Sequence, residues 1–278
     1  MFFMSTIQSP KSVPELVKLI AKHGKRSLLV SGIDMSSERS AIGKVVIDVA
    51  GVGLLNEIER ARDKITIGTG INLGRLAREA VGENGLLRQA SSIIANPLVR
   101  NKITLVEALH PDSQYFDITT PLVLMEAKIR LQSPTGKRTL SIRDYLEAVT
   151  KGLKKGEIPT TVEFSKLPPD ERVGFFRVAR MGGKGTVSAA ARMKLVRTIC
   201  VAPEIVVSSL TLVPLRAKGA EKEIVGKPAN EASIKRAAEI AAEEILELSE
   251  KDSSYERTLV EITVARTLRS IMEGSIPV

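Results

Sequence analysis

Short apolar runs alternate with segments of helically spaced apolar residues along the first part of the chain. Ser12 and Glu15 have the spacing of a capping box, apolar residues follow at helical spacing, and Gly24 marks the end of a first helix. The segments that follow are expected to form three buried strands and a short helix, over residues 27–30, 44–49, 64–68 and 73–81. Strands that take turns with helices in this way indicate an α+β or α/β fold.

The middle of the chain has a less regular pattern. A long irregular stretch is expected between Thr104 and Asp117. After it, the pattern predicts a helix, a strand, a hairpin turn, a second helix and a further strand, over residues 119–127, 128–132, 134–137, 142–147 and 160–165. The Leu-Pro-Pro-Asp stretch at residues 167–170 is the best candidate for a linker. We therefore expect a first domain over residues 1–166 and a C-terminal domain over residues 171–278.

The C-terminal part combines strand and helix patterns. After the linker, the sequence predicts three strands of a small antiparallel sheet, over residues 175–180, 190–196 and 205–212. One apolar stripe with the helical period then runs through residues 232–248, and a last helix begins at Ser253 or Ser254 and stops at Gly274. The whole pattern is that of an α+β protein.

The composition is that of a soluble globular protein, with 43% hydrophobic and 26% charged residues in a chain of 278. No apolar run approaches the roughly 20 residues that are needed to span a bilayer. The N-terminus, residues 1–5, is too short and too uncharged for a signal peptide. We therefore expect a cytoplasmic protein that does not contact a membrane.

The few cysteine and histidine residues limit the metal chemistry. Cys200 is the single cysteine, so no internal disulfide can form, and its apolar neighbours predict a buried small side chain. An iron–sulfur cluster needs about four ligands, mostly cysteine, so none is expected within this chain. His23 and His110 lie far apart in sequence without cysteine neighbours, which argues against a zinc site.

The net charge of +9 raises the question of nucleic-acid binding. Aromatic residues make up only 3% of the chain and tryptophan is absent, so a base-stacking surface is poorly supplied. The lysine and arginine residues are spread along the sequence. We interpret them as solvated surface, with some facing an acidic partner, and expect no nucleic-acid binding.

The run from Gln89 to Thr104 is the most informative part of the chain. Asn96-Pro97 should stop a helix, because proline disfavours the α conformation in the residue before it. Arg100 and Asn101 then place a guanidinium and an amide in an otherwise apolar stretch, where polar groups need partners. This chemistry alone leaves open a structural turn and a functional loop.

The same run resembles the segment A-S-x-x-I-A-N-P-x-I-R-N-x-G-T-I-G-G-N of one protein family. That family comprises the FAD-binding medium subunits of xanthine dehydrogenase, carbon monoxide dehydrogenase and related molybdenum hydroxylases. Five further segments match the family's patterns in the same order, over residues 30–35, 46–55, 65–69, 221–227 and 254–259. The resemblance covers nearly the whole chain.

The resemblance implies a two-lobed, PCMH-like FAD-binding domain followed by a small C-terminal antiparallel sheet with helices. It implies an oxidoreductase subunit that passes electrons from iron–sulfur clusters through FAD to an acceptor. Its partners would be a molybdopterin-binding large subunit and an iron–sulfur small subunit in a hetero-oligomer. The cofactor contacts carried over are Ser31, Gly32, Ile33, Asp34, Met35, Thr104, Leu105 and Asp117. A flavin supplies the chemistry itself, so no catalytic side chain is expected.

Both expected flavin loops depart from the family pattern. Glycine-rich loops hold a pyrophosphate with backbone N–H groups, but Ile33 stands in the first loop and Ile103 precedes the second. In the second, the family's last three positions, G-G-N, are Val106, Glu107 and Ala108. The carboxylate would repel a nearby phosphate by an energy on the order of several kcal/mol. Two hypotheses stay open: a working FAD subunit with altered loops, and a non-catalytic scaffold or assembly subunit that has lost FAD.

Other motifs carry weaker signals. Gly68, Gly70 and Gly74 form an imperfect Rossmann motif, which we interpret as structural. Residues 182–186 form an imperfect P-loop, for which we favour a turn, or else a basic contact for an acidic partner or for the adenine end of a cofactor. His110-Pro111-Asp112 and the following serine resemble catalytic residues only by type.

Overall fold

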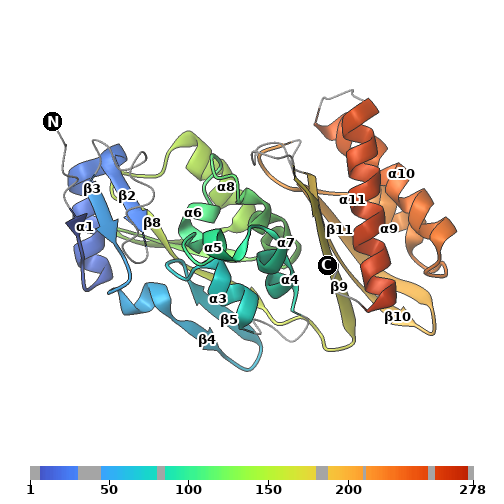
Figure 1. Cartoon of the computed structure of the whole chain (residues 1–278), viewed down its shortest axis with the longest axis horizontal. Helices are drawn as coiled ribbons and strands as arrows, with labels where there is room; N and C mark the ends of the chain where they lie inside the picture. Colours follow the sequence, from blue (N-terminus) through green and yellow to red (C-terminus); the bar gives the residue numbers. More distant parts are fainter. Residues whose placement is uncertain are drawn as a thin grey trace.

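The computed structural model describes residues 7–30, 45–79, 85–179, 187–208, 211–249 and 254–274. Figure 1 shows an elongated molecule, in which the chain runs from a small N-terminal lobe through a central sheet to two long helices at the far end. The described residues form three sheets of three, five and four strands. The α+β class expected from the sequence is confirmed.

The N-terminal lobe is a small parallel sheet with one helix. Its elements are β1 Ile7–Gln8, α1 Val13–His23, the 3-10 turn η1 Gly24–Arg26, β2 Ser27–Val30 and β3 Val45–Asp48, with strand order β1-β3-β2. The Ser12 hydroxyl accepts from the Glu15 N–H, as the predicted capping box requires. The Glu15 carboxylate accepts from the N–H of Lys11 at 2.8 Å, one residue before the expected partner.

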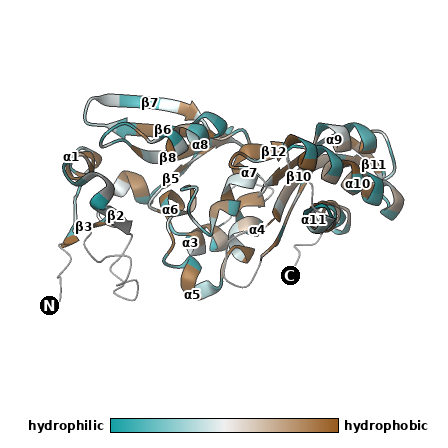
Figure 2. Ribbon diagram, turned by 90° about the horizontal axis from the view of Figure 1, so that it is seen from above, coloured by the Kyte–Doolittle hydropathy of each residue, from teal (hydrophilic) through white to brown (hydrophobic). Residues whose placement is uncertain are grey.

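The central sheet is antiparallel, with strand order β4-β5-β8-β6-β7. Its strands are β4 Ile58–Arg60, β5 Lys64–Gly68, β6 Lys128–Ser133, β7 Gly136–Ser141 and β8 Ile158–Ser165. The segments between them form η3 Gly53–Asn56, α3 Leu73–Arg78, α4 Leu86–Ile93, α5 Pro97–Arg100, α6 Leu105–Ala108, η4 Phe116–Ile118, α7 Thr119–Leu124 and α8 Ile142–Lys151. Figure 2 shows α3, α4, α6 and α7 together on one side of this sheet.

The C-terminal sheet is antiparallel, with strand order β12-β11-β10-β9. Its elements are β9 Glu171–Val178, β10 Val187–Val196, β11 Ile199–Ser208 and β12 Leu215–Arg216, followed by α9 Lys218–Ile224, α10 Glu231–Leu248 and α11 Ser254–Glu273. Cys200 is fully buried in the core between this sheet and its helices, as expected. In the described part of the chain, no helix is long and apolar enough to cross a membrane.

The two faces of the C-terminal sheet belong to different cores. Ala189 and Ala191 pack with α9, α10 and α11, whereas Ala190 and Phe175 lie in the core of the central sheet. The hydroxyl groups of Thr120 in α7 and Ser188 in β10 share a hydrogen bond of 2.8 Å. One hydrophobic core therefore extends past the expected linker at residues 167–170, and the division into two domains stays a prediction.

Several short elements differ from those expected. The prediction of an irregular stretch directly after Thr104 is wrong, because this stretch begins with the helical turn α6. The helix expected over residues 119–127 ends at Leu124. Elements of two to four residues, such as β4, β12 and α6, are too short to show a period in the sequence.

The glycines of the imperfect Rossmann motif allow close backbone contacts. A Cβ atom on Gly68 would lie 2.4 Å from the carbonyl of Leu55, and one on Gly74 would lie 2.0 Å from the Asn101 side-chain oxygen. Strand β5 pairs antiparallel with both neighbours, β4 and β8, so it lacks the parallel partner of a dinucleotide-binding unit. Gly68 and Gly74 therefore lie where the backbone and a neighbouring side chain leave no room for a larger residue.

We predict that Gly68→Ala lowers the free energy of unfolding by about 2–3 kcal/mol, because the new methyl group would collide with fixed backbone atoms of η3. Gly53→Ala is the matched control, since its nearest contact is the flexible end of Glu57 at 3.3 Å. Urea unfolding measures both. Equal losses in the two variants would contradict the packing role of Gly68.

Candidate cofactor site

The run from Gln89 to Thr104 folds as two short helices joined by a turn. Helix α4 ends at Ile93, and the Asn96 side chain caps α5 by accepting from the Val99 N–H at 3.0 Å. The Arg100 guanidinium donates to the carbonyl of Ser92 at the end of α4. The predicted helix stop is thus confirmed, and Arg100 has a structural partner.

The second expected flavin loop forms helix α6, and side chains of the same turn cap the N-terminus of this helix. Thr104 is the N-cap, and its hydroxyl accepts from the Glu107 N–H at 3.4 Å. The same hydroxyl and the Thr104 N–H donate to one carboxylate oxygen of Glu107, at 2.7 and 2.8 Å. This is a complete capping box, in which Glu107 is a cap.

The remaining N–H groups of the loop also have partners inside the protein. Leu105 donates to the carbonyl of Ile71, and Val106 donates to the carbonyl of Thr69, both at 2.8 Å. Ala108 donates to the carbonyl of Thr104 at 3.0 Å, as in any helical turn. From Thr104 to Ala108, each backbone N–H has a protein acceptor.

Asp117 is also bound within the protein. It lies in η4, which packs against α6, and is only 4% exposed. A carboxylate oxygen of Asp117 lies 2.9 Å from the guanidinium of Arg177 in β9, and both side chains are buried. Arg177 also donates to the carbonyl of Ile94. This ion pair joins the central sheet's helices to the C-terminal sheet.

The charges of Glu107 in the loop and of Arg177 in the ion pair both affect the pKa of Tyr115. Burial raises the pKa of its phenol, and the Glu107 carboxylate raises it further, whereas a hydrogen bond from Gln114 and the charge of Arg177 lower it. Burial also raises the pKa of Glu107, against the hydrogen bonds from Thr104. The charges of Glu107 and Arg177 therefore both act on the phenol of Tyr115.

The structure describes three of the eight expected cofactor contacts, which stay predictions. Thr104, Leu105 and Asp117 lie together, and all three are buried. The other five, Ser31, Gly32, Ile33, Asp34 and Met35, lie outside the described residues. The sequence interpretation missed the partner role of Arg177. It also took Glu107 for a repulsive charge alone, although the Thr-x-x-Glu spacing is the signal of a capping box.

This half of the site does not fit the pyrophosphate of FAD. A pyrophosphate needs free N–H donors or cations, and each N–H from Thr104 to Ala108 already has an acceptor. Glu107 adds a negative charge, which costs about 4 kcal/mol per phosphate charge at roughly 4 Å and an effective dielectric of about 20. Val106 and Ala108 offer no polar side chain in compensation.

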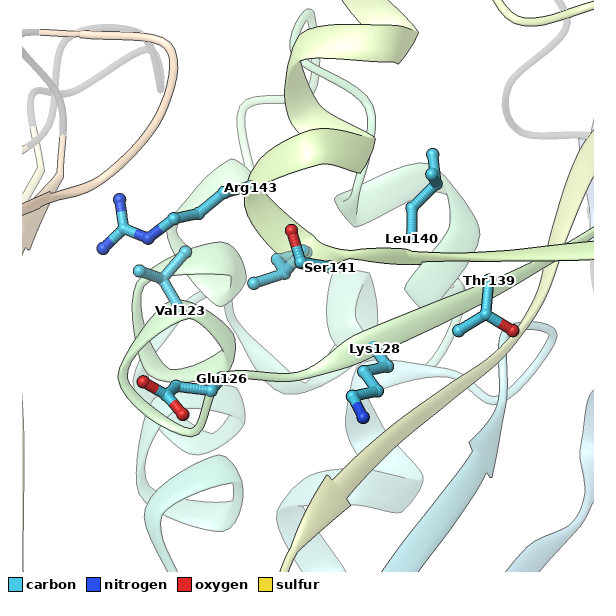
Figure 3. A pocket seen from close by; sticks show the side chains of 8 residues that line it. Val123, Glu126, Lys128, Thr139, Leu140, Ser141 and Arg143 are labelled. Carbon is cyan, nitrogen blue, oxygen red and sulfur yellow. The ribbon is translucent and has the colours of Figure 1, made fainter.

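A separate hollow of about 560 Å³ lies between α7, the end of β7 and the start of α8. Figure 3 shows Glu126 and Arg143 on one side of it and Lys128 on another, so its charges are mixed. Of the expected cofactor contacts, the three that the structure describes, Thr104, Leu105 and Asp117, do not line it. The described residues also contain no group of three His, Cys, Asp or Glu side chains that could hold a metal ion.

The other candidate side chains form no catalytic constellation. His110 and Asp112 are exposed, and the His110 ring accepts from the Asp112 N–H at 3.2 Å. The Ser113 hydroxyl accepts from the Tyr115 N–H, as in an ordinary turn. The P-loop-like stretch at residues 182–186 lies outside the described residues.

We predict that Arg177→Ala lowers the free energy of unfolding by about 3–5 kcal/mol, because it leaves the buried Asp117 carboxylate without its cation. Adding Asp117→Asn should recover part of the loss by removing that charge. Arg269→Ala, which breaks an exposed pair with Glu231, is the control and should barely change the urea midpoint. A loss of unfolding free energy for Arg177→Ala as small as that of the control would show that the buried ion pair does not stabilise the fold.

We predict that Glu107→Gln becomes more stable relative to the wild-type chain as pH rises from about 4 to about 7. The raised pKa of Glu107 means that the folded chain holds this proton more tightly than the unfolded chain. The resulting stability is present below the unfolded pKa and is lost as pH rises through the folded pKa. Urea midpoints of both proteins at the two pH values measure it; a constant difference would contradict it.

Comparison with known proteins identifies the family to which this chain belongs. The family described as "FAD binding domain in molybdopterin dehydrogenase" matches residues 3–166, and "CO dehydrogenase flavoprotein C-terminal domain" matches residues 181–271. The carbon monoxide dehydrogenase medium chain of Afipia carboxidovorans is 23% identical over 240 residues, which cover 84% of this chain and 83% of that one. The glyceraldehyde dehydrogenase medium chain of Sulfolobus acidocaldarius is 23% identical over 269 residues, covering 94% and 96%.

A solved structure shares the fold. Quinoline 2-oxidoreductase from Pseudomonas putida 86 contains a chain that superimposes with a TM-score of 0.81 at 21% identity, covering 100% of both chains. The match of the first family extends over more than half of the present chain. The chain therefore belongs to the family of FAD-binding medium subunits of the carbon monoxide dehydrogenase and xanthine dehydrogenase type.

Proposed function

We propose that this chain is the medium-type subunit of a molybdenum hydroxylase complex and that its role there is structural. It would hold together a molybdopterin-binding large subunit and an iron–sulfur small subunit. The single observation that carries the structural role is the closed loop at residues 104–108, whose N–H groups all have protein acceptors. The cytoplasmic location expected from the sequence is part of this proposal.

The preserved fold supports a role in assembly. The match to medium chains extends over almost the whole length of both partners. A match over the full length means that every lobe of the medium-chain fold is present, including those through which a medium chain would contact other subunits. Proteins of one fold can differ in chemistry, because function depends on the site rather than on the fold.

Electron transfer through FAD is the second candidate function. The match to the FAD-binding domain over residues 3–166 favours it, and the first loop keeps Gly32 and Asp34 of the family pattern. In this case the flavin would be held mainly by the first loop, since the second offers no free N–H donor. The two candidates differ in flavin content, whereas both require the complex.

We predict that the tagged chain, isolated from the cells that encode it, carries molybdenum and iron together with two further subunits, but no flavin. Metal analysis and mass spectrometry identify the partners. Acid denaturation followed by absorbance near about 450 nm measures released flavin, separately from the colour of iron–sulfur clusters.

Two outcomes would contradict parts of this proposal. Stoichiometric release of FAD would overturn the structural role and establish the second candidate. A chain that elutes alone, without molybdenum or iron, would overturn membership in the complex itself. Isolation at low and high salt provides the control, because an interface built on charges weakens at high ionic strength.

A further inference from the structure

The Glu107 carboxylate is placed where it satisfies two donors that face the same way. The N–H and the hydroxyl of Thr104 both donate to its oxygen Oε2, at 2.8 and 2.7 Å. Two convergent donors of this kind are what an external phosphate oxygen would need. In this chain the anion that they bind is a side chain of the same turn.

We infer that Glu107 is an internal replacement for the phosphate, and that its carboxylate excludes FAD from the second loop even when the neighbouring positions carry the family's residues. The inference deepens the proposed function, because it rests on the flavin-free role and names the residue that produces it. It also means that the loss is local: the surrounding fold retains the shape of an FAD-binding domain.

Three features make Glu107 the deciding residue. An attached carboxylate is present at a fixed distance, so it competes with a free anion at a high effective concentration. Its charge repels a phosphate that approaches the same donors. Burial raises the pKa of the carboxyl, and the hydrogen bonds from the N–H and hydroxyl of Thr104 act against this by favouring the ionised form.

The neighbouring positions explain why one substitution is not enough to restore binding. Val106 and Ala108 have no polar side-chain atoms, and the Val106 N–H is held by the carbonyl of Thr69 at 2.8 Å. A glycine at 106 would let the backbone turn toward a ligand, and an asparagine at 108 would supply an amide donor. A loop with all three changes regains free donors and loses the carboxylate.

The test is a gain of binding in the full-length chain. The variant V106G/E107G/A108N is compared with V106G/A108N, which keeps Glu107 and is the matched control. FAD is added at a series of concentrations, and the quenching of flavin fluorescence and the flavin retained after gel filtration are measured. We expect the triple variant to bind FAD at least about tenfold more tightly than the control and the wild-type chain.

The outcomes separate this inference from the proposed function. Equal FAD binding by the triple variant and the control, or binding by the wild-type chain, would overturn the role of Glu107. A triple variant that has the circular dichroism and cooperative melting of the wild type but binds no FAD would overturn it as well. If the triple variant fails to fold, the variants E107Q and E107A replace it in the test. We expect faster hydrogen exchange at the Thr104 amide in E107A than in E107Q, because only E107A lacks an acceptor for that N–H. Equal exchange in the two variants would overturn the inference. Failure to assemble with other subunits would instead contradict the proposed function and leave the FAD result standing.

Discussion

The structure around the candidate site depends on one constraint: a buried N–H or hydroxyl must have an acceptor. The turn from Thr104 to Ala108 meets it within the protein, through the carbonyls of Thr69 and Ile71 and the carboxylate of Glu107. A loop that binds a pyrophosphate meets the same constraint by leaving donors for the ligand. The two solutions exclude each other, because one N–H cannot fully satisfy both acceptors.

The same backbone contacts hold the central lobe together, which explains how the loop can close without loss of the fold. Thr69 and Ile71 follow β5, whose position is fixed by the close approach of Gly68 to Leu55. Their carbonyls bind α6, and α6 packs against η4, where Asp117 pairs with Arg177 of the C-terminal sheet. The cofactor region is thus a structural junction between two sheets, with a continuous core behind it.

The sequence predicted the parts that depend on repetition and failed where the structure depends on a single contact. Long elements such as β6, α8 and α10 show their period, and the Asn96-Pro97 stop follows from proline geometry. Helix α6 is four residues long, too short for a period, so only its capping box could have revealed it. The Asp117–Arg177 pair joins residues that lie far apart in sequence, and no local pattern specifies it.

A family resemblance and the binding of a cofactor depend on different residues. Among the residues that carry the resemblance, Ala90 and Ile94 are buried in the core, and Asn96 caps a helix. Replacing buried residues of this kind destabilises the fold. A pyrophosphate contact depends instead on a few positions with free donors. In this chain the turn at residues 104–108 uses its donors within a capping box and on neighbouring carbonyls. Membership in a cofactor-binding family therefore establishes the architecture, whereas the cofactor must be argued from the donors that the loop leaves free.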